Sequence, residues 1–245
     1  LVLIMRVDPK IDKDIIDAAK NLKIIGVCSV GLNHIDMDYA KEKGIQIFNA
    51  PGLNANAVAE LTISKMLDIS RGTMTANTDV KVKHEWDKYK FVGRELRGKT
   101  LGVMGFGRIG RRVGELGRAF GMTVVAYDPF LKAEDFEKEH ATGMSIDELL
   151  KAADFVSIHV PLTPETKDLF NAKSIAEMKD DAVVLNMSRG GIVNEKDMYE
   201  ALKAGKIGGY ATDVMENELA GSGLTGNDTF ASPLFECDNF IVSPH

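Results

Sequence analysis

The stretch VMGFGRIG, residues 103–110, decides how this sequence folds. It joins an apolar run, TLGVM, to a run of helical periodicity, RIGRRVGELGRAF. In a dinucleotide-binding turn, Gly105 would permit the tight turn, Gly107 would let the backbone approach a pyrophosphate, and Gly110 would let the helix pack against the strand. The helix N-terminus would then present free N–H groups to the anion. The same glycines would also suit a purely structural turn.

The next strand separates these two interpretations. MTVVAYD, residues 122–128, ends in Asp128, which follows Gly110 by 18 residues. An acidic residue about 20 residues beyond the glycines accepts hydrogen bonds from an adenosine ribose, and its charge repels a 2′-phosphate. We therefore predict a site for NAD rather than NADP.

Apolar β-rich runs alternate with helical patterns along the chain. This alternation predicts βαβ units, right-handed crossovers and a doubly wound, mostly parallel sheet of the α/β class. Strands are expected at residues 1–5, 23–29, 45–51, 100–105, 122–128, 154–160, 182–188, 208–214 and 239–245. Helices are expected at 12–20, 34–44, 54–70, 107–120, 145–153, 172–178 and 195–205, and in parts of 73–99. A break at APGLN, residues 50–54, predicts two domains, 1–53 and 54–245.

The composition narrows the function classes. A net charge of −6 disfavours nucleic acid and anionic membranes as partners, because both attract basic patches. No apolar run approaches the roughly 20 residues that cross a bilayer. Cys28 and Cys237 fit neither a disulfide framework nor a metal-binding spacing, so we expect no metal and two buried thiols in a reducing, cytoplasmic compartment. Since the sequence opens inside one strand and stops after another, we expect it to be part of a longer protein.

An enzyme that oxidises an alcohol with a nicotinamide cofactor needs an acid/base group beyond the carboxyl ends of its strands. Histidine suits this task because its ordinary pKa is about 6.5. His159 and His245 each end an apolar strand, and the pattern alone does not separate them. His34, His84 and His140 lie in helical or polar stretches and are expected to be solvated.

Charged residues follow two further strands. Arg189, in NMSRGG, stands between a strand end and two glycines, which suits bidentate recognition of a carboxylate; the alternative is a surface salt bridge. Asp213 ends GGYATD, and Glu216 and Glu218 follow it. An acid at this place could orient a histidine and raise its pKa, or it could lie in a solvated loop.

Taken together, these motifs resemble the D-isomer-specific 2-hydroxyacid dehydrogenase family over nearly the whole chain. The matching stretches are NLKIIGVCSVGLNHID, FNAPGLNANAVAEL, KTLGVMGFGRIGRRV, HVPLTPETKDLF, LNMSRGGIVNEKDMYEAL, ATDVMENE and SPLFECDNFIVSPH. The resemblance implies a Rossmann NAD-binding domain at 54–245 and part of a flavodoxin-like substrate domain at 1–53. It also implies a homodimer built through the NAD-binding domains, with the region of Trp86 as a contact.

The resemblance further implies a catalytic trio. Its arginine falls on Arg189 of the SRGG motif, its glutamate on Glu218, and its histidine on His245 of the PH motif. His245 would exchange a proton with the substrate oxygen, Glu218 would pair with it and favour its protonated form, and Arg189 would hold the carboxylate and polarise the carbonyl. His159 is thereby assigned to the turn beside the cofactor.

Other positions are carried over from the family motifs. The residues implied to contact the cofactor, besides the three glycines and Asp128, are Arg108, Ile109, His159, Pro161, Met187, Ser188 and Asp213, the last binding the nicotinamide carboxamide. The substrate carboxylate would meet the amides around Val30 and Gly31. Arg6 would also contact the substrate, although MRVDPKID departs from the family's RSRT-like pattern.

The resemblance therefore implies an NAD-dependent oxidoreductase that acts on a small D-2-hydroxy acid. The run SGLTGNDTFASPLFECDN, residues 222–239, is most similar to phosphoglycerate dehydrogenases of serine biosynthesis, so 3-phosphoglycerate is the first candidate substrate. A hydroxypyruvate, glyoxylate or other 2-keto acid reductase is the alternative. A third hypothesis is an NADH-sensing corepressor that binds partner proteins. The sequence contains no basic tail or peptide-docking feature that would support it.

Overall fold

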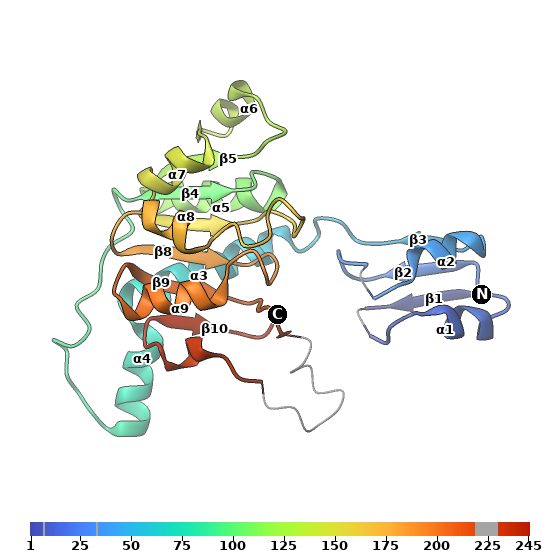
Figure 1. Ribbon diagram of the computed structural model, residues 1–245, viewed down its shortest axis with the longest axis horizontal. Helices are drawn as coiled ribbons and strands as arrows, with labels where there is room; N and C mark the ends of the chain where they lie inside the picture. The colour runs from blue at the N-terminus through green and yellow to red at the C-terminus, as the bar shows by residue number, and fades with distance from the viewer. Residues whose placement is uncertain (7, 33, 219–229) are drawn as a thin grey trace. The chain divides into compact units, whose positions relative to one another are not determined.

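A computed structural model describes residues 1–6, 8–32, 34–218 and 230–245 (Figure 1). The chain divides into two compact units, Leu1–Asn56 and Ala57–His245. The smaller unit is built on a three-stranded sheet and the larger on a seven-stranded sheet. All registered strand pairs are parallel, which confirms the predicted α/β class.

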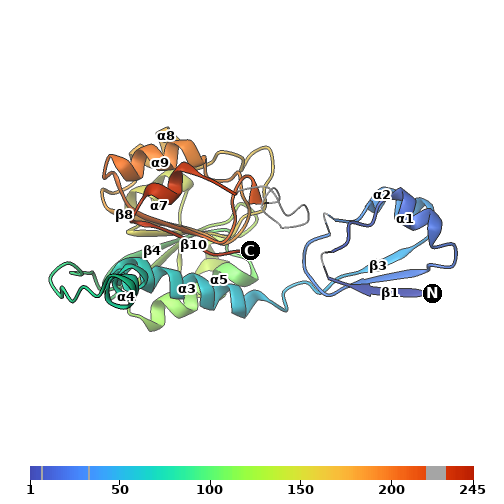
Figure 2. The ribbon, with the colours of Figure 1, turned by 90° about the horizontal axis from the view of Figure 1, so that it is seen from below.

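The smaller unit consists of two strand–helix repeats and a third strand. Its elements are β1 (Val2–Met5), α1 (Lys13–Ala18), β2 (Ile24–Val27), α2 (Met37–Glu42) and β3 (Gln46–Phe48), with sheet order β1-β2-β3. Both helices lie on the same face of the sheet (Figure 2). Each begins at an aspartate cap: Asp12 accepts a hydrogen bond from Ile15 N–H, and Asp36 accepts one from Tyr39 N–H.

The larger sheet reverses its strand order at β4. Its strands are β4 (Thr100–Met104), β5 (Thr123–Tyr127), β6 (Thr142–Gly143), β7 (Phe155–Ile158), β8 (Ala182–Asn186), β9 (Ile207–Thr212) and β10 (Phe240–Val242), arranged β10-β9-β8-β7-β4-β5-β6. The chain winds outward from β4 in one direction and from β7 in the other. Ligands of such sheets bind where the order reverses, beyond the carboxyl ends of the strands.

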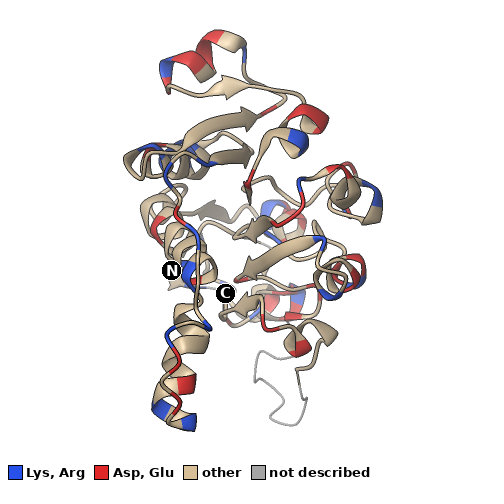
Figure 3. Cartoon of the chain, turned by 90° about the vertical axis from the view of Figure 1, so that its left-hand side faces the viewer, with Lys and Arg blue, Asp and Glu red and all other residues tan. Residues whose placement is uncertain are grey.

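Helices cover both faces of this sheet (Figure 2). On one face lie α3 (Ala55–Arg71) and α5 (Arg108–Ala119), and on the other lie α7 (Ile146–Ala152), α8 (Ala172–Glu177) and α9 (Glu195–Lys203). The seven strands contain no charged residue, and Figure 3 shows the charges on helices and loops. Strands buried on both faces need this continuous apolar character, because each face contributes to a separate core.

An arm, defined as residues 73–92, extends from the end of α3 (Figure 1). It contains α4 (Thr73–Thr78) and a π-helical turn, η1 (Asp79–Lys83), so the prediction of partial helix here is confirmed. Buried Asp79 binds Lys83, at 2.7 Å, and Lys90, and these ammonium groups hold the pKa of its carboxyl below the usual value. The apolar side chains that the arm exposes are Met74, Val80, Val82, Trp86, Tyr89 and Val92.

The structure differs from the sequence predictions in three short elements and in the exposure of one cysteine. The helix α6 (Ala133–Lys138) and the strand β6 were not predicted, nor was the 3-10 helix η3 (Pro233–Glu236). The prediction that both thiols are buried is wrong for Cys28, which is exposed, and right for Cys237. Within the described ranges, no helix combines the length and apolar character needed to cross a membrane.

Packing of α3 on the sheet depends on Gly209 of β9. A β-carbon there would overlap Cδ1 of Ile69 and lie 2.7 Å from its Cγ1. We expect Gly209→Ala to lower the free energy of unfolding by about 1–3 kcal/mol, the usual cost of overpacking a core. Urea denaturation measures this loss.

The control is a double-mutant cycle with Ile69→Ala. Since Ile69→Ala removes the atoms that the new methyl group would meet, the two destabilisations should sum to more than that of the double variant. Simple additivity would show that this contact does not set the distance between α3 and β9.

Candidate active site

The predicted site residues of the larger unit gather at the carboxyl ends of its strands. Gly105 follows β4, Asp128 follows β5, His159 follows β7, Arg189 follows β8 and Asp213 follows β9. His245 stands three residues beyond β10 in the same way. Because all these strands are parallel, their carboxyl ends share one edge of the sheet.

Two positions of the turn after β4 leave no room for a β-carbon, and a third borders open space. Gly105 adopts φ +87°, and a β-carbon there would lie 2.6 Å from the carbonyl oxygen of His159. A β-carbon on Gly110 would overlap the carbonyl oxygen of Gly105, so only glycine lets α5 start this close to β4. At Gly107, the N-cap of α5, a β-carbon would meet no heavy atom within 4 Å. The open space beside this helix N-terminus fits an anionic group.

Asp128 is oriented by the backbone next to this turn. Its Oδ2 accepts a hydrogen bond from Phe106 N–H at 3.0 Å, and its Oδ1 accepts one from Phe130 N–H at 3.0 Å. The carboxylate is therefore held beside the second residue of the glycine turn. A negative charge fixed here suits ribose hydroxyls and opposes a 2′-phosphate.

Asn186, the last residue of β8, connects two of the loops. Its Oδ1 accepts hydrogen bonds from Ser188 N–H, at 3.2 Å, and Ser188 Oγ, at 2.8 Å. Its Nδ2 donates to the carbonyl oxygen of Arg189 at 2.9 Å, while its own carbonyl accepts from Thr212 Oγ1 at 2.8 Å. Sequence reasoning missed this residue, although a buried amide ending the apolar run AVVL was the available signal. The side chain of Met187 lies in the core, so only its backbone can face a ligand.

Arg189 lies on a loop pressed against the one after β9. A β-carbon on Gly190 would overlap the carbonyl oxygen of Met215, so the two loops touch at this glycine. The Arg189 Nη1 donates to the carbonyl oxygen of Ser188 at 2.6 Å. A guanidinium has five N–H donors, so this bond orients the group and leaves others for a carboxylate.

His245 and Glu218 form a hydrogen-bonded pair. The His245 Nδ1 lies 2.9 Å from Glu218 Oε1, and Glu218 Oε2 accepts a hydrogen bond from Met215 N–H at 3.2 Å. With the carboxylate occupying Nδ1, the Nε2 nitrogen is the one available to a substrate. The His245 side chain is 53% exposed, so a small molecule can reach it.

The loop that carries Glu218 is tied to the start of α9. Glu216 N–H donates to Glu195 Oε1 at 2.7 Å, and Glu195 N–H donates to Glu216 Oε1 at 3.3 Å. Burial raises the pKa of Glu195, the more enclosed of these two carboxyls. Glu216, which sequence reasoning left open, thus has a structural role.

His159 lies in a different environment from His245. Its Nε2 is 2.7 Å from Ser157 Oγ, and its buried Nδ1 has no hydrogen-bond partner among the described residues. Burial lowers the pKa of His159 to about 3, so this ring is neutral at physiological pH. The expectation that the other histidines are solvated is correct for His84 and His140 and wrong for His34, whose Nε2 is buried.

Asp213 is enclosed, and a buried lysine that was not predicted lies within its electrostatic reach. Asp213 is 9% exposed, its Oδ1 has no partner among the described residues, and burial raises its pKa. Lys65 of α3 is 4% exposed and within electrostatic reach of Asp213. A buried acceptor without a partner fits the N–H₂ group of a carboxamide. Lys65 was missed because a lysine in LTISKML reads as an exposed helix position.

The remaining predicted residues lie in the smaller unit. The loop after β2 holds Val30 and Gly31, and its carbonyl oxygens are bonded within the unit: Ser29 O accepts from Ala50 N–H and Val30 O from Asn49 Nδ2. Arg6 follows β1 and is exposed. Of the run 222–239, residues 222–229 lie outside the described residues.

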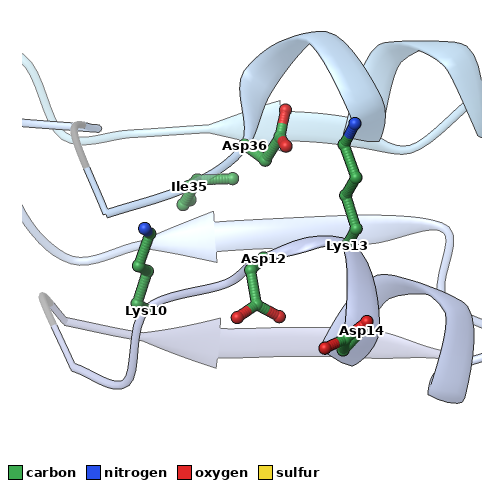
Figure 4. Close-up of a pocket in the computed structure, with 6 residues that line it drawn as sticks. All are labelled: Lys10, Asp12, Lys13, Asp14, Ile35 and Asp36. Carbon is green, nitrogen blue, oxygen red and sulfur yellow. The ribbon is translucent and has the colours of Figure 1, made fainter.

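A hollow of about 480 Å³ also lies in the smaller unit (Figure 4). It is lined by Lys10, Asp12, Lys13, Asp14, Ile35 and Asp36. Its carboxylates Asp12 and Asp36 serve as the caps of α1 and α2, which accounts for their placement. Across the described part of the chain, no group of three or more His, Cys, Asp or Glu side chains is arranged to hold a metal ion.

Comparisons with known proteins show which family and which relatives the chain resembles. Residues 63–245 match the family model for the D-isomer specific 2-hydroxyacid dehydrogenase, NAD binding domain. The chain is 43% identical over 245 residues to D-3-phosphoglycerate dehydrogenase of Methanocaldococcus jannaschii, covering 100% of this chain and 45% of that protein. It is 41% identical over 244 residues to hydroxypyruvate reductase of Thermotoga maritima, covering 100% of this chain and 76% of that protein.

The chain is also similar to a solved structure that contains NAD. D-lactate dehydrogenase from Aquifex aeolicus, complexed with NAD and lactic acid, superposes with a TM-score of 0.83 at 36% identity, covering 100% of this chain and 75% of that one. The predictions of a Rossmann fold and of NAD as the cofactor are therefore confirmed. The chain spans a little under half the length of the phosphoglycerate dehydrogenase that it matches.

The open space at Gly107 yields a test. We expect Gly107→Ala to leave the melting temperature nearly unchanged, because the backbone at φ −76° suits alanine and the methyl group meets no protein atom. The methyl group would instead occupy the approach to the pyrophosphate, so NADH affinity, measured by calorimetry, should fall about tenfold or more, or at least 1.4 kcal/mol.

Gly110→Ala is the matched comparison. There the methyl group meets the Gly105 backbone, so stability should fall together with affinity. Unchanged NADH affinity in Gly107→Ala would show that the cofactor does not approach this turn.

Proposed function

Because this chain belongs to the D-isomer specific 2-hydroxyacid dehydrogenase family, we propose that its protein is an NAD-dependent oxidoreductase that interconverts a small D-2-hydroxy acid and its 2-keto acid. The observation that carries the proposal is the pair of His245 Nδ1 and Glu218 Oε1, 2.9 Å apart. An imidazole with one nitrogen bound to a carboxylate and the other free is the usual arrangement of a general acid/base.

The residues of the larger unit would divide the work of the reaction. NAD, when bound, supplies the hydride acceptor or donor. In oxidation, His245 Nε2 takes the proton of the substrate hydroxyl, and Glu218 stabilises the charge that the ring then acquires. In reduction, the same nitrogen returns a proton to the keto oxygen. Arg189 holds the substrate carboxylate and polarises the reacting carbonyl.

The cofactor would be held by the edge of the sheet at the switch point. Gly105, Gly107 and Gly110 would receive the pyrophosphate, and Asp128 the adenosine ribose. The unpartnered Oδ1 of Asp213 would accept a hydrogen bond from the nicotinamide carboxamide. The other residues proposed to line the cofactor are Arg108, Ile109, His159, Pro161, Met187 and Ser188.

We assign the smaller unit to the substrate. Its loop around Val30 and Gly31 has two carbonyl oxygens bonded within its own unit, and the loop would offer its amides to the substrate carboxylate. Arg6 is exposed and would add a positive charge for an anionic substrate. In this proposal residues 1–53 form the substrate domain and residues 54–245 form the cofactor domain.

The first candidate substrate is 3-phosphoglycerate, which would place the protein in serine biosynthesis. It is supported by the 43% identity to the Methanocaldococcus jannaschii dehydrogenase. The second is hydroxypyruvate, supported by the 41% identity to the Thermotoga maritima reductase. The third candidate substrate is lactate, supported by the similarity to the D-lactate dehydrogenase structure from Aquifex aeolicus. A cytoplasmic location belongs to the same proposal.

A panel of 2-keto acids tests the function. We expect the full-length protein to oxidise NADH with one of 3-phosphohydroxypyruvate, hydroxypyruvate, glyoxylate and pyruvate, the first being preferred. His245→Asn should lower kcat by about 100-fold or more, since a positioned acid/base contributes 10²–10⁴-fold. NADH absorbance at steady state measures both.

Binding separates a chemical defect from a structural one. His245→Asn should retain NADH affinity, because the ring contributes to proton transfer and not to the glycine turn. NADH binding without turnover of any acid would contradict the dehydrogenase proposal and favour a cofactor-sensing protein.

The arm supports a homodimer as part of the same proposal. Trp86 is 84% exposed, and Val82, Tyr89 and Val92 are also exposed along the arm. Clustered apolar side chains of this size mark protein interfaces more often than free surface. The internal bonds of Asp79 keep the arm folded while these side chains face outward.

Sedimentation tests the dimer. We expect the protein to sediment as a dimer and Trp86→Glu to shift it toward the monomer, because a buried unpaired charge opposes association. Phe130→Glu, which alters a 92% exposed ring outside the arm, is the control and should leave the dimer intact. A monomeric wild-type protein would overturn the proposal.

A further inference from the structure

Lys65 is a buried lysine that has no role in the proposed reaction. Lys65, in the middle of α3, is only 4% exposed, and its helix neighbour Met66 is fully buried. Lysine is almost never enclosed to this degree unless an opposite charge accompanies it. The ammonium group of Lys65 therefore needs an explanation in its surroundings.

The direction of α3 points Lys65 toward the site. Ile69 of α3 contacts Gly209 of β9, and the last turn of the helix borders Asp238 and Asn239, which precede β10. The helix thus runs from the carboxyl ends of the strands toward their amino ends. Lys65 lies one turn before Ile69 on the same helix face, which brings it toward the carboxyl end of β9.

Asp213 is the residue at that end of β9. It is 9% exposed, and its Oδ1 has no partner among the described residues. The charged or titratable groups near Asp213 are Lys65 from α3, His245 beyond β10, and Glu218 from the loop after β9. Asp213 and Asp68 are the carboxylates that raise the pKa of Lys65 against the effect of burial.

Lys65 and Asp213 each oppose the effect of burial on the pKa of the other. Burial lowers the pKa of Lys65 while Asp213 raises it; burial raises the pKa of Asp213 while His245 and Lys65 lower it. Each charge therefore makes the other less costly to enclose.

We propose that Lys65 is a positioning residue whose ammonium group balances the buried charge of Asp213 and so sets the relative affinity of the site for the two redox states of the cofactor. The inference rests on the proposed placement of the nicotinamide beside Asp213. The nicotinamide ring is positively charged in NAD⁺ and neutral in NADH. A carboxylate alone would favour NAD⁺, whereas a carboxylate neutralised by Lys65 gives less preference to the charged ring.

The test compares dissociation constants rather than rates. Isothermal titration calorimetry of the full-length protein at pH 8 gives the dissociation constants for NAD⁺ and NADH. In Lys65→Met, the ratio of the NAD⁺ constant to the NADH constant should fall about three- to tenfold, as expected for removal of one unit charge at several ångströms. Lys65→Gln serves as a second neutral variant.

Two controls separate charge from structure. Lys65→Arg keeps the charge and should keep the wild-type ratio, even if both affinities change. Lys173→Met removes an exposed charge on α8, across the sheet from α3, and should leave the ratio unchanged. A merely structural role of Lys65 would alter both constants together and leave the ratio as in the wild type, which would overturn the inference.

The outcomes also distinguish this inference from the proposed function. If the wild-type protein binds neither cofactor, or turns over no keto acid, the proposed function fails. If the wild type binds and reacts but the ratio does not change in Lys65→Met or Lys65→Gln, only the inference about Lys65 fails.

Discussion

Two backbone hydrogen bonds, made by the N–H groups of Gly105 and His159, fix the end of β4 between its neighbouring strands. Gly105 N–H donates to the carbonyl oxygen of Tyr127, and His159 N–H donates to that of Met104. The end of β4 is therefore bound to both neighbouring strands, and the approach of Gly105 to the His159 carbonyl leaves no room for a side chain. Because the three strand ends are aligned at this point, the glycine turn, Asp128 and the loop after β7 open onto one edge.

The two histidines at strand ends show how surroundings divide the roles of identical side chains. His159 is enclosed, and its one bonded nitrogen meets a hydroxyl, so its ring stays neutral. His245 is half exposed, and its Nδ1 lies 2.9 Å from a carboxylate oxygen of Glu218. The first environment suits a structural contact beside a cofactor, and the second suits proton transfer.

Much of this arrangement could be predicted from the sequence because the signals were local. The glycine spacing, Asp128 and the apolar strands are patterns of a few residues with one physical meaning each. Residue pattern alone did not separate His159 from His245, since both end apolar strands; only the family resemblance did so. β6 was missed because a two-residue strand shows no clear period, and α6 was missed because Phe136 is the single large apolar residue of AEDFEK.

Asn186 and Lys65 were missed for a different reason. A single polar residue in an apolar stretch gives no sign of its role. Its partners lie in distant parts of the sequence, which a local pattern does not reveal. The burial of Cys28 was predicted wrongly because it was inferred from the number of cysteines. The alternation of inward and outward residues along the strand decides it. Ile25 and Val27 face the core, so the intervening and following positions face outward.

The position of β10 in the sheet has a consequence for local stability. This outer strand forms three registered pairs, all with β9, whereas β4 is paired along both sides. Outer strands open at a smaller free-energy cost than central ones. Fluctuations that release β10 would separate His245 from Glu218 while the glycine turn stays formed. In such an opening the proposed proton transfer would be lost while the proposed dinucleotide site persists.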